Sequence, residues 1–268
     1  MIVHKKSAAN KHQTTRSQPI YYPTTCGQTT VVNKCAASVT LNAEAGQSNY
    51  LWSTGATTSS ITVTTSALYW WETIDQATNK VVNGNFSAGN TGFTSDYTYK
   101  SPNSSTALYD EGAYTVTTNP HNVHPDFASF PDHTGDSGGQ MMVVNGSVVA
   151  GVSIWKETIN VQPNTDYIFS VWFTSVHPKN PGKLNFSINN TLLGAPIELT
   201  AGTPDWKNFT VRWSSGSSTS ANIGIVNQNT AQAGNDFALD DLVFAPVCRN
   251  YFDVHLYTNP SKPSITSQ

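Results

Sequence analysis

The chain has 268 residues, of which 38% are hydrophobic, 11% aromatic and only 12% charged. This apolar content supports a packed core, and the abundance of Thr, Ser, Asn and Gly favours short strands and turns over long helices. The net charge of −3 excludes a basic field for nucleic acid or anionic lipid, and no apolar run is long enough to span a membrane.

Residues 1–24 predict a disordered leader. Its basic cluster of Lys5, Lys6, Lys11 and Arg16 has no apolar periodicity, which is typical of a flexible tail rather than a binding patch. The leader also lacks the apolar core of a signal peptide. Export is therefore an expectation that depends on the resemblances given below.

Three cysteines follow an uneven spacing. Cys26 and Cys35 flank a polar, turn-forming stretch and predict a local disulfide, which leaves Cys248 to pair with a segment outside this chain. The alternative is three reduced thiols in a core. The absence of any Cys-x-x-Cys excludes a zinc ribbon.

Short strand-like segments separated by polar turns fill residues 25–78, with Trp52 as the expected core aromatic. The segments are Ala37–Ala43, Tyr50–Ser53, Ser60–Thr65 and Leu68–Ile74. The string YLWSTGATTSSITVT from Tyr50, followed by ALYWW from Ala67, resembles the small immunoglobulin-like repeats of secreted Bacteroidetes proteins. The resemblance implies an immunoglobulin-like domain in a secreted or cell-surface multidomain protein.

A second predicted domain covers residues 79–248, and residues 249–268 are expected to be a tail or the start of a further segment. Apolar residues alternate with polar ones along 167–174, 184–189 and 208–213. This period of two indicates antiparallel strands that cover a core, and its repetition indicates a sandwich or barrel. No segment has the pattern of an amphipathic helix. The sequence therefore predicts an all-β protein with two domains.

Two motifs at the ends of this second domain carry a family resemblance. NGNFS from Asn83 with Gly92-Phe, and GNDFALDDLVF from Gly234, resemble the opening and closing signatures of jelly-roll modules in carbohydrate-binding families four, nine and twenty-two. The interior strings DHTGDSGGQMMVVNG from Asp132 and VQPNTDYIFSVW from Val161 are similar to Bacteroidetes versions. The resemblance implies a jelly-roll β-sandwich with a glycan as its partner.

The closing motif contains the densest acidic group of the chain. Consecutive residues of a regular strand point to opposite faces, so one of Asp240 and Asp241 is expected to point inward and to need a partner. In the resembled modules a structural Ca²⁺ joins the first and last strands, and the carried-over ligands are Asn85, Ser87 and Asp241. Ser87 replaces the usual Glu, which weakens this expectation. The alternative partner is a backbone N–H group.

The loop over residues 119–139 contains three histidines and three aspartates: His121, His124, Asp126, Asp132, His133 and Asp136. They could form a transition-metal site, but their spacing fits no defined motif, and a structural, hydrogen-bonded role is expected. Gly135-Asp-Ser-Gly-Gly spells the nucleophile motif of chymotrypsin-like proteases without the upstream histidine context, and turn chemistry explains it equally well. A hydrolase would require two convergent acids in a cleft. We expect a non-catalytic protein.

Sugar binding requires an aromatic face beside hydrogen-bonding groups. Trp172 lies on the polar face of its predicted strand, and Asn185 and Arg212 lie on comparable faces of theirs, with Trp155 as a further candidate. If these strands are neighbours, they form a glycan-binding surface. Alternatively, another domain or subunit covers Trp172 and Arg212. The chain would then be a structural or adhesive building block of an extracellular assembly, with neighbouring domains or self-association instead of a soluble ligand.

Overall fold

The computed structural model describes residues 26–45, 50–74, 78–200 and 204–257, so the predicted disordered leader lies outside the described residues. Within these ranges the protein consists almost entirely of strands joined by turns, with the 3-10 helix η2 at Pro120–Asn122. The predicted all-β class is confirmed. No helix in the described ranges has the length and apolar character needed to cross a membrane.

The N-terminal strands form one compact group, which we call the small part. They are β1 (Thr29–Lys34), β2 (Val39–Asn42), β3 (Leu51–Trp52), β4 (Ser60–Val63) and β5 (Ala67–Ile74). The antiparallel pair β2–β4 packs its apolar residues against β3 and β5, around the buried Trp52 and Trp71. Trp52 is the core aromatic that its sequence context predicts, with only 1% of its surface exposed.

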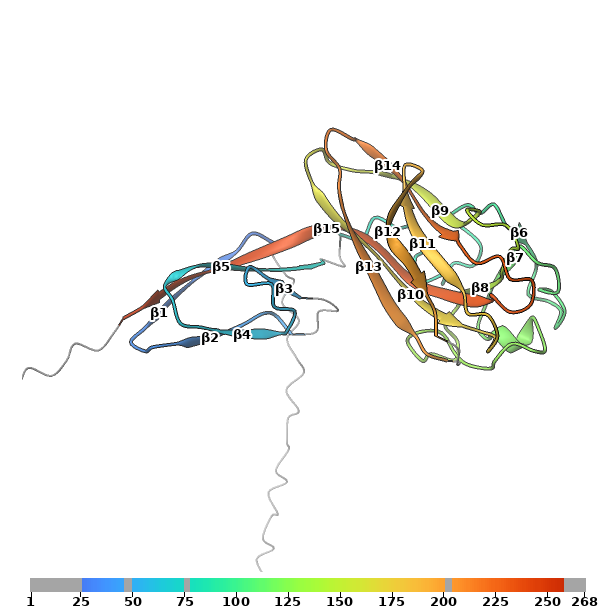
Figure 1. The fold of residues 1–268 in the computed structure, drawn as a ribbon, viewed down its shortest axis with the longest axis horizontal. Helices are drawn as coiled ribbons and strands as arrows, with labels where there is room; N and C mark the ends of the chain where they lie inside the picture. The colour runs from blue at the N-terminus through green and yellow to red at the C-terminus, as the bar shows by residue number, and fades with distance from the viewer. Residues whose placement is uncertain (1–25, 46–49, 75–77, 201–203, 258–268) are drawn as a thin grey trace, which may run out of the picture.

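The remaining strands form the large part, which has two layers (Figure 1). They are β6 (Thr98–Tyr99), β7 (Ala113–Thr117), β8 (Met141–Asn145), β9 (Ser153–Asn160), β10 (Asp166–Ser175), β11 (Lys183–Ile188), β12 (Thr191–Glu198), β13 (Lys207–Ser214) and β14 (Ser220–Asn227). With β15 (Phe237–Leu256) added, one layer has the order β13-β10-β15-β8-β7-β6, and the other has the order β12-β11-β14-β9.

A single strand, β15 (Phe237–Leu256), runs through both parts (Figure 1). Its first half pairs with β10 and β8, and its second half pairs with β5 and, in parallel, with β1. The predicted boundary at residue 248 therefore falls inside a strand. Residues 249–256, which we expected to be a tail, complete the sheet of the small part. Phe252, Val254 and Leu256 do alternate with Asp253 and His255, as a strand requires, but alternation alone does not identify β1 and β5 as the partners of this segment.

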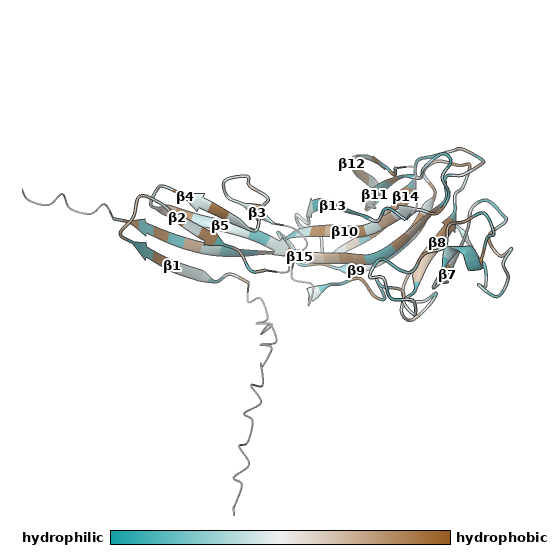
Figure 2. Ribbon diagram, turned by 90° about the horizontal axis from the view of Figure 1, so that it is seen from below, coloured by the Kyte–Doolittle hydropathy of each residue, from teal (hydrophilic) through white to brown (hydrophobic). Residues whose placement is uncertain are grey.

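The main core lies between the two layers of the large part. Tyr167, Phe169, Val171 and Phe173 point into it from β10 and expose at most 1% of their surface, as their alternation predicts. Figure 2 shows hydrophobic colouring along β10 and β15, the central strands of this layer. A second cluster, around Phe127 and Phe130, lies where the loop before β8 covers the outer face of the same sheet.

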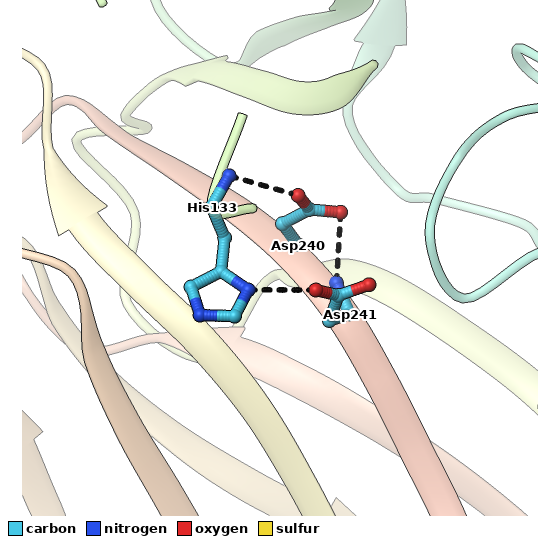
Figure 3. A group of neighbouring side chains, drawn as sticks. All are labelled: His133, Asp240 and Asp241. Carbon is cyan, nitrogen blue, oxygen red and sulfur yellow. Dashed lines mark hydrogen bonds and ion pairs between the residues drawn. The ribbon is translucent and has the colours of Figure 1, made fainter. Parts of the chain in front are cut away.

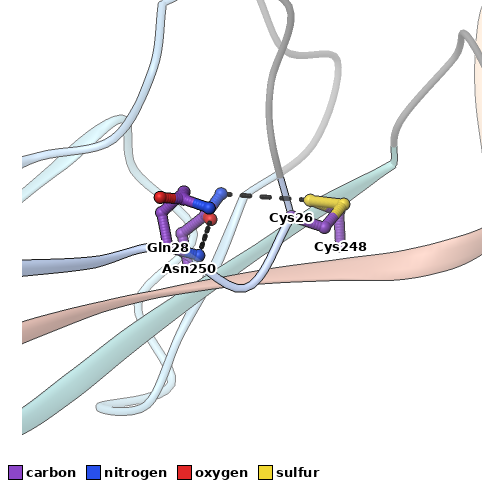
Figure 4. Close-up of a disulfide and its surroundings, with 4 residues drawn as sticks. All are labelled: Cys26, Gln28, Cys248 and Asn250. Carbon is purple, nitrogen blue, oxygen red and sulfur yellow. Dashed lines mark hydrogen bonds between the residues drawn. A yellow bond between two sulfur atoms is a disulfide. The ribbon is translucent and has the colours of Figure 1, made fainter.

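The disulfide joins Cys26 to Cys248 (Figure 4), so the predicted Cys26–Cys35 pairing is wrong. The stretch between Cys26 and Cys35 contains strand β1 instead of a turn. Six residues of strand span roughly 20 Å, whereas a disulfide requires Cα atoms within about 7 Å of each other. The Cα atoms of Cys26 and Cys248 lie 5.1 Å apart, because β1 runs beside the second half of β15, and Cys35 is exposed and free.

Candidate functional site

A cavity of about 630 Å³ opens on the outer face of the sheet where β10 and β15 meet the segment that leads into the large part. Its polar lining comes from Asn79, Asn83, Asn85, His133, Thr134, Ser170, Asn208 and Asp241. Its apolar lining comes from Ile74, Val81, Trp172, Leu242 and Val243, with the backbone of Gly84 between them. Ile74 belongs to β5, so both parts of the protein contribute to the cavity.

A β-bulge in β15 shapes the floor of this cavity. Ser170 of β10 pairs with Val243 and Trp172 pairs with Asp240, so two residues of β15 lie opposite one residue of β10. Asp241, within the bulge, has a φ of 47°, a left-handed conformation that Asp tolerates better than most residues. The bulge interrupts the strand alternation. The expectation that Asp240 and Asp241 point to opposite faces is therefore wrong, and both contact the same residue.

That residue is His133, which comes from the loop before β8 (Figure 3). Its backbone N–H donates to Asp240 Oδ2 at 3.1 Å, and its Nδ1 lies 2.6 Å from Asp241 Oδ2. The N–H of Asp241 donates to Asp240 Oδ1 at 2.8 Å. The buried carboxylate of Asp240 thus receives two backbone N–H groups, which is the alternative that the sequence left open.

This corner places two carboxyl groups beside a single imidazole. Asp240 exposes 1% of its surface. Its burial, and next the charge of Asp241, raise the pKa of the Asp240 carboxyl to about 8, against a smaller lowering by the two backbone N–H donors. Among the described residues that line the cavity there is no Lys or Arg. The site therefore suits a ligand that donates hydrogen bonds or carries positive charge.

Trp172 is half-buried and lines the cavity, on the polar face of β10 that the sequence predicts. The imidazole of His133 lies flat on its indole, with ring centroids 3.8 Å apart and planes at 20°. The ring of Trp206 lies in an edge-to-face arrangement with the same imidazole, with ring centroids 5.9 Å apart. Part of the expected stacking surface is thus already covered, and the rest of the indole faces the cavity.

The structure separates the other residues predicted to bind a glycan from Trp172. Trp155 is fully buried in the main core, and Asn185 lies in the opposite layer with 2% of its surface exposed. A glycan cannot reach either side chain, so these two predictions are wrong. The strand that carries Asn185, β11, pairs with β12 and β14 rather than with β10, which the sequence alone could not tell.

Arg212 lies on β13, beside β10 as the prediction required, but its guanidinium is held by two carboxylates. Its Nη1 donates to Glu72 Oε2 at 2.6 Å, and its Nη2 donates to Asp166 Oδ2 at 2.6 Å. Glu72 exposes only 3% of its surface and also pairs with Arg249. Arg212 therefore connects the large part to β5 of the small part, the structural role that the sequence analysis kept as its alternative.

The calcium candidates fit that ion poorly. The hydroxyl of Ser87 donates to Asn85 Oδ1 at 3.0 Å, both residues are exposed, and Asp241 is bonded to His133. Ca²⁺ takes six to eight oxygen ligands and prefers several carboxylates. This trio offers one carboxylate and two neutral groups that pair with each other. Calcium binding by these three residues stays a prediction.

Sequence reasoning missed the partnership between His133 and the two aspartates. In the sequence, His133 is part of an Asp-His-Thr string, and Asp240 and Asp241 are adjacent to each other. More than a hundred positions separate His133 from the two aspartates, so nothing in the sequence connects them. The other loop histidines have local roles. His121 Nδ1 lies 3.0 Å from the carbonyl of Phe127, and His124 stacks on the Phe127 ring. The glycine-rich string after them is a turn, in which Asp132 Oδ1 accepts from the N–H of Asp136 at 2.8 Å.

No protein-family model and no curated protein matches the chain. Among solved structures, it is similar to the EclA C-terminal domain, described as a sugar-binding protein, with 21% identity and a TM-score of 0.32 over 34% of this chain and 66% of that one. It is also similar to a family 16 carbohydrate-binding module, with 16% identity and a TM-score of 0.39 over 62% and 99%. A family 61 module in complex with beta-1,4-galactotriose has 16% identity and a TM-score of 0.41 over 63% and 98%. These TM-scores are too low to assign the chain to a family.

Proposed function

We propose that the chain is a non-catalytic glycan-binding protein, and that the sugar occupies the cavity beside Trp172. The observation that carries the proposal is an open cavity of about 630 Å³ that combines one half-exposed indole with amide, hydroxyl and carboxylate groups. Ligand pockets commonly measure roughly 300–1,000 Å³, so this volume accommodates one or two sugar rings.

The chemistry of the lining supports a sugar over an anionic or an apolar ligand. The part of the Trp172 indole that faces the cavity offers a surface for the C–H groups of a pyranose ring. The side-chain amides of Asn85 and Asn208 and the carboxylate of Asp241 can exchange hydrogen bonds with hydroxyl groups. Asn208 Nδ2 already donates to Ser170 Oγ at 3.0 Å, which fixes its amide. No covalent step is required.

A location outside the cell accords with this proposal. The Cys26–Cys248 disulfide joins positions 222 residues apart, and such bonds persist in oxidising compartments. We therefore propose a secreted or cell-surface protein. Calcium as a structural ion of this module is a separate proposal, and the CaCl₂ titration described below tests whether the chain binds that ion.

A structural or adhesive building block is the second candidate. The observation that favours it is the junction between the two parts, where β15 is continuous and the buried Glu72 pairs with both Arg212 and Arg249. These contacts suit a stiff element that carries load or joins copies. Self-association of the chain, measured by sedimentation in the absence of any sugar, would favour this candidate.

The decisive experiment for glycan binding combines an array of soluble oligosaccharides with pull-down on insoluble xylan and cellulose. Any binder is then titrated against Trp172→Ala and against Trp70→Ala, a half-buried tryptophan of the small part that lies outside the cavity. We expect Trp172→Ala to abolish binding and Trp70→Ala to leave it unchanged. Equal binding by both variants, or no binding to any sugar, refutes the proposal.

A further inference from the structure

We propose that His133, Asp240 and Asp241 form a binding site for a divalent transition-metal ion of the Zn²⁺ class. Each side chain offers one ligand atom, and these atoms lie within 4.8 Å of one another (Figure 3). Zinc binds nitrogen and oxygen ligands at about 2.0–2.2 Å, so a single ion can reach all three after small side-chain rotations. The ligands come from two segments that no spacing motif links.

The balance of charge at this corner calls for a cation. Two carboxylates share one imidazole, and one of them, Asp240, is almost fully buried. In the described part of the chain, no Lys or Arg forms an ion pair with either aspartate, and His133 is the one basic partner of Asp241. Buried carboxylates are ordinarily paired with a positive group or a metal. A divalent ion would supply the positive charge that no Lys or Arg side chain of the described residues provides here.

The candidate ligands are held in place by contacts with neighbouring groups. The imidazole of His133 is fixed by its stacking on Trp172, and the Asp240 carboxylate is fixed by the N–H groups of His133 and Asp241. His133 Nδ1 and Asp241 Oδ2 lie 2.6 Å apart, so two of the candidate ligand atoms are already next to each other. A metal ion would take the place of this direct contact between the two ligand atoms.

The mixture of ligand types selects the class of ion. Imidazole nitrogen suits Zn²⁺, Ni²⁺ and Cu²⁺ better than Ca²⁺, which prefers oxygen ligands alone. His133 and Asp241 both line the cavity, so an ion can enter from it and keep an open position filled by water. The site shares only Asp241 with the calcium candidates, and its other two ligands are different.

Calorimetric titration of the EDTA-treated full chain with ZnCl₂, and separately with CaCl₂, tests the proposal. We expect one zinc site whose affinity falls by at least about 10- to 100-fold in His133→Gln and in Asp241→Asn. The matched control is His124→Gln, which removes an imidazole of the same loop that stacks on Phe127 and should leave zinc affinity unchanged. Melting temperatures of the variants establish that each one folds.

Three results would overturn the proposal. They are the absence of saturable zinc binding up to about 1 mM, zinc binding that persists in His133→Gln, and saturation by Ca²⁺ but not by Zn²⁺. The second result would mean that the zinc is bound elsewhere in the chain, for example by the histidines outside the described residues. The glycan proposal is judged separately, by the Trp172 dependence of sugar binding in EDTA-treated protein, so either proposal can fail without the other.

Discussion

The disulfide between Cys26 and Cys248 is expected to dominate the stability of the protein. It closes a loop with a sequence separation of 222, and in the chain-entropy model a cross-link of that length destabilises the unfolded state by about 5 kcal/mol at 25 °C. The bond also ties the start of β1 to the strand that both parts share. Cys26→Ala should therefore lower the free energy of unfolding by several kcal/mol.

Urea denaturation followed by tryptophan fluorescence measures this effect, with peptide mapping by mass spectrometry to identify the linkage. Cys35→Ala is the matched control, because Cys35 is exposed and free, and its removal should change stability by less than about 0.5 kcal/mol. A Cys26–Cys35 peptide in the non-reduced map, or equal destabilisation by the two variants, would refute the pairing and with it the parallel placement of β1 beside β15.

Other consequences of the structure can be tested by the same unfolding measurements. Glu72→Gln should lower the free energy of unfolding by roughly 3 kcal/mol, because the guanidinium groups of Arg212 and Arg249 lose their buried carboxylate partner. Asp166→Asn, at the exposed end of the network, should lower it by less than about 1 kcal/mol. Equal losses in the two variants would contradict this. Burial raises the pKa of Asp236 from 3.8 to about 7, so the native state retains a proton that the unfolded state has lost. This carboxyl should lower stability by at most about 4 kcal/mol as pH rises from about 4 to 7, so Asp236→Asn should make the fall of stability with pH shallower; an unchanged slope would reject the assignment. In Gly84→Ala, the added Cβ would lie 2.2 Å from the Leu242 carbonyl oxygen, so the variant should lose stability and any cavity ligand together, and a wild-type melting curve would argue against that packing.

The layers of the large part could be predicted from sequence because alternation is a local property. On β10, every second residue from Tyr167 to Phe173 is large and apolar, and burial of that face follows from the pleat alone. Strand order is not local. Asn185 and Trp172 carry equally polar surroundings in sequence, yet β11 and β10 belong to opposite layers. Whether two polar faces meet depends on long-range pairing, and the sequence contains no local signal for it.

The candidate site departs from prediction for a related reason, at the bulge in β15. The inference that Asp240 and Asp241 point in opposite directions assumes a regular strand, and one extra residue opposite β10 cancels it. Asp-Asp-Leu contains no Gly or Pro that would mark the irregularity. The bulge lies within the pairing of β15 with β10, between Trp172 opposite Asp240 and Ser170 opposite Val243. Its position depends on this long-range register, and the extra residue of β15 brings both carboxylates to His133.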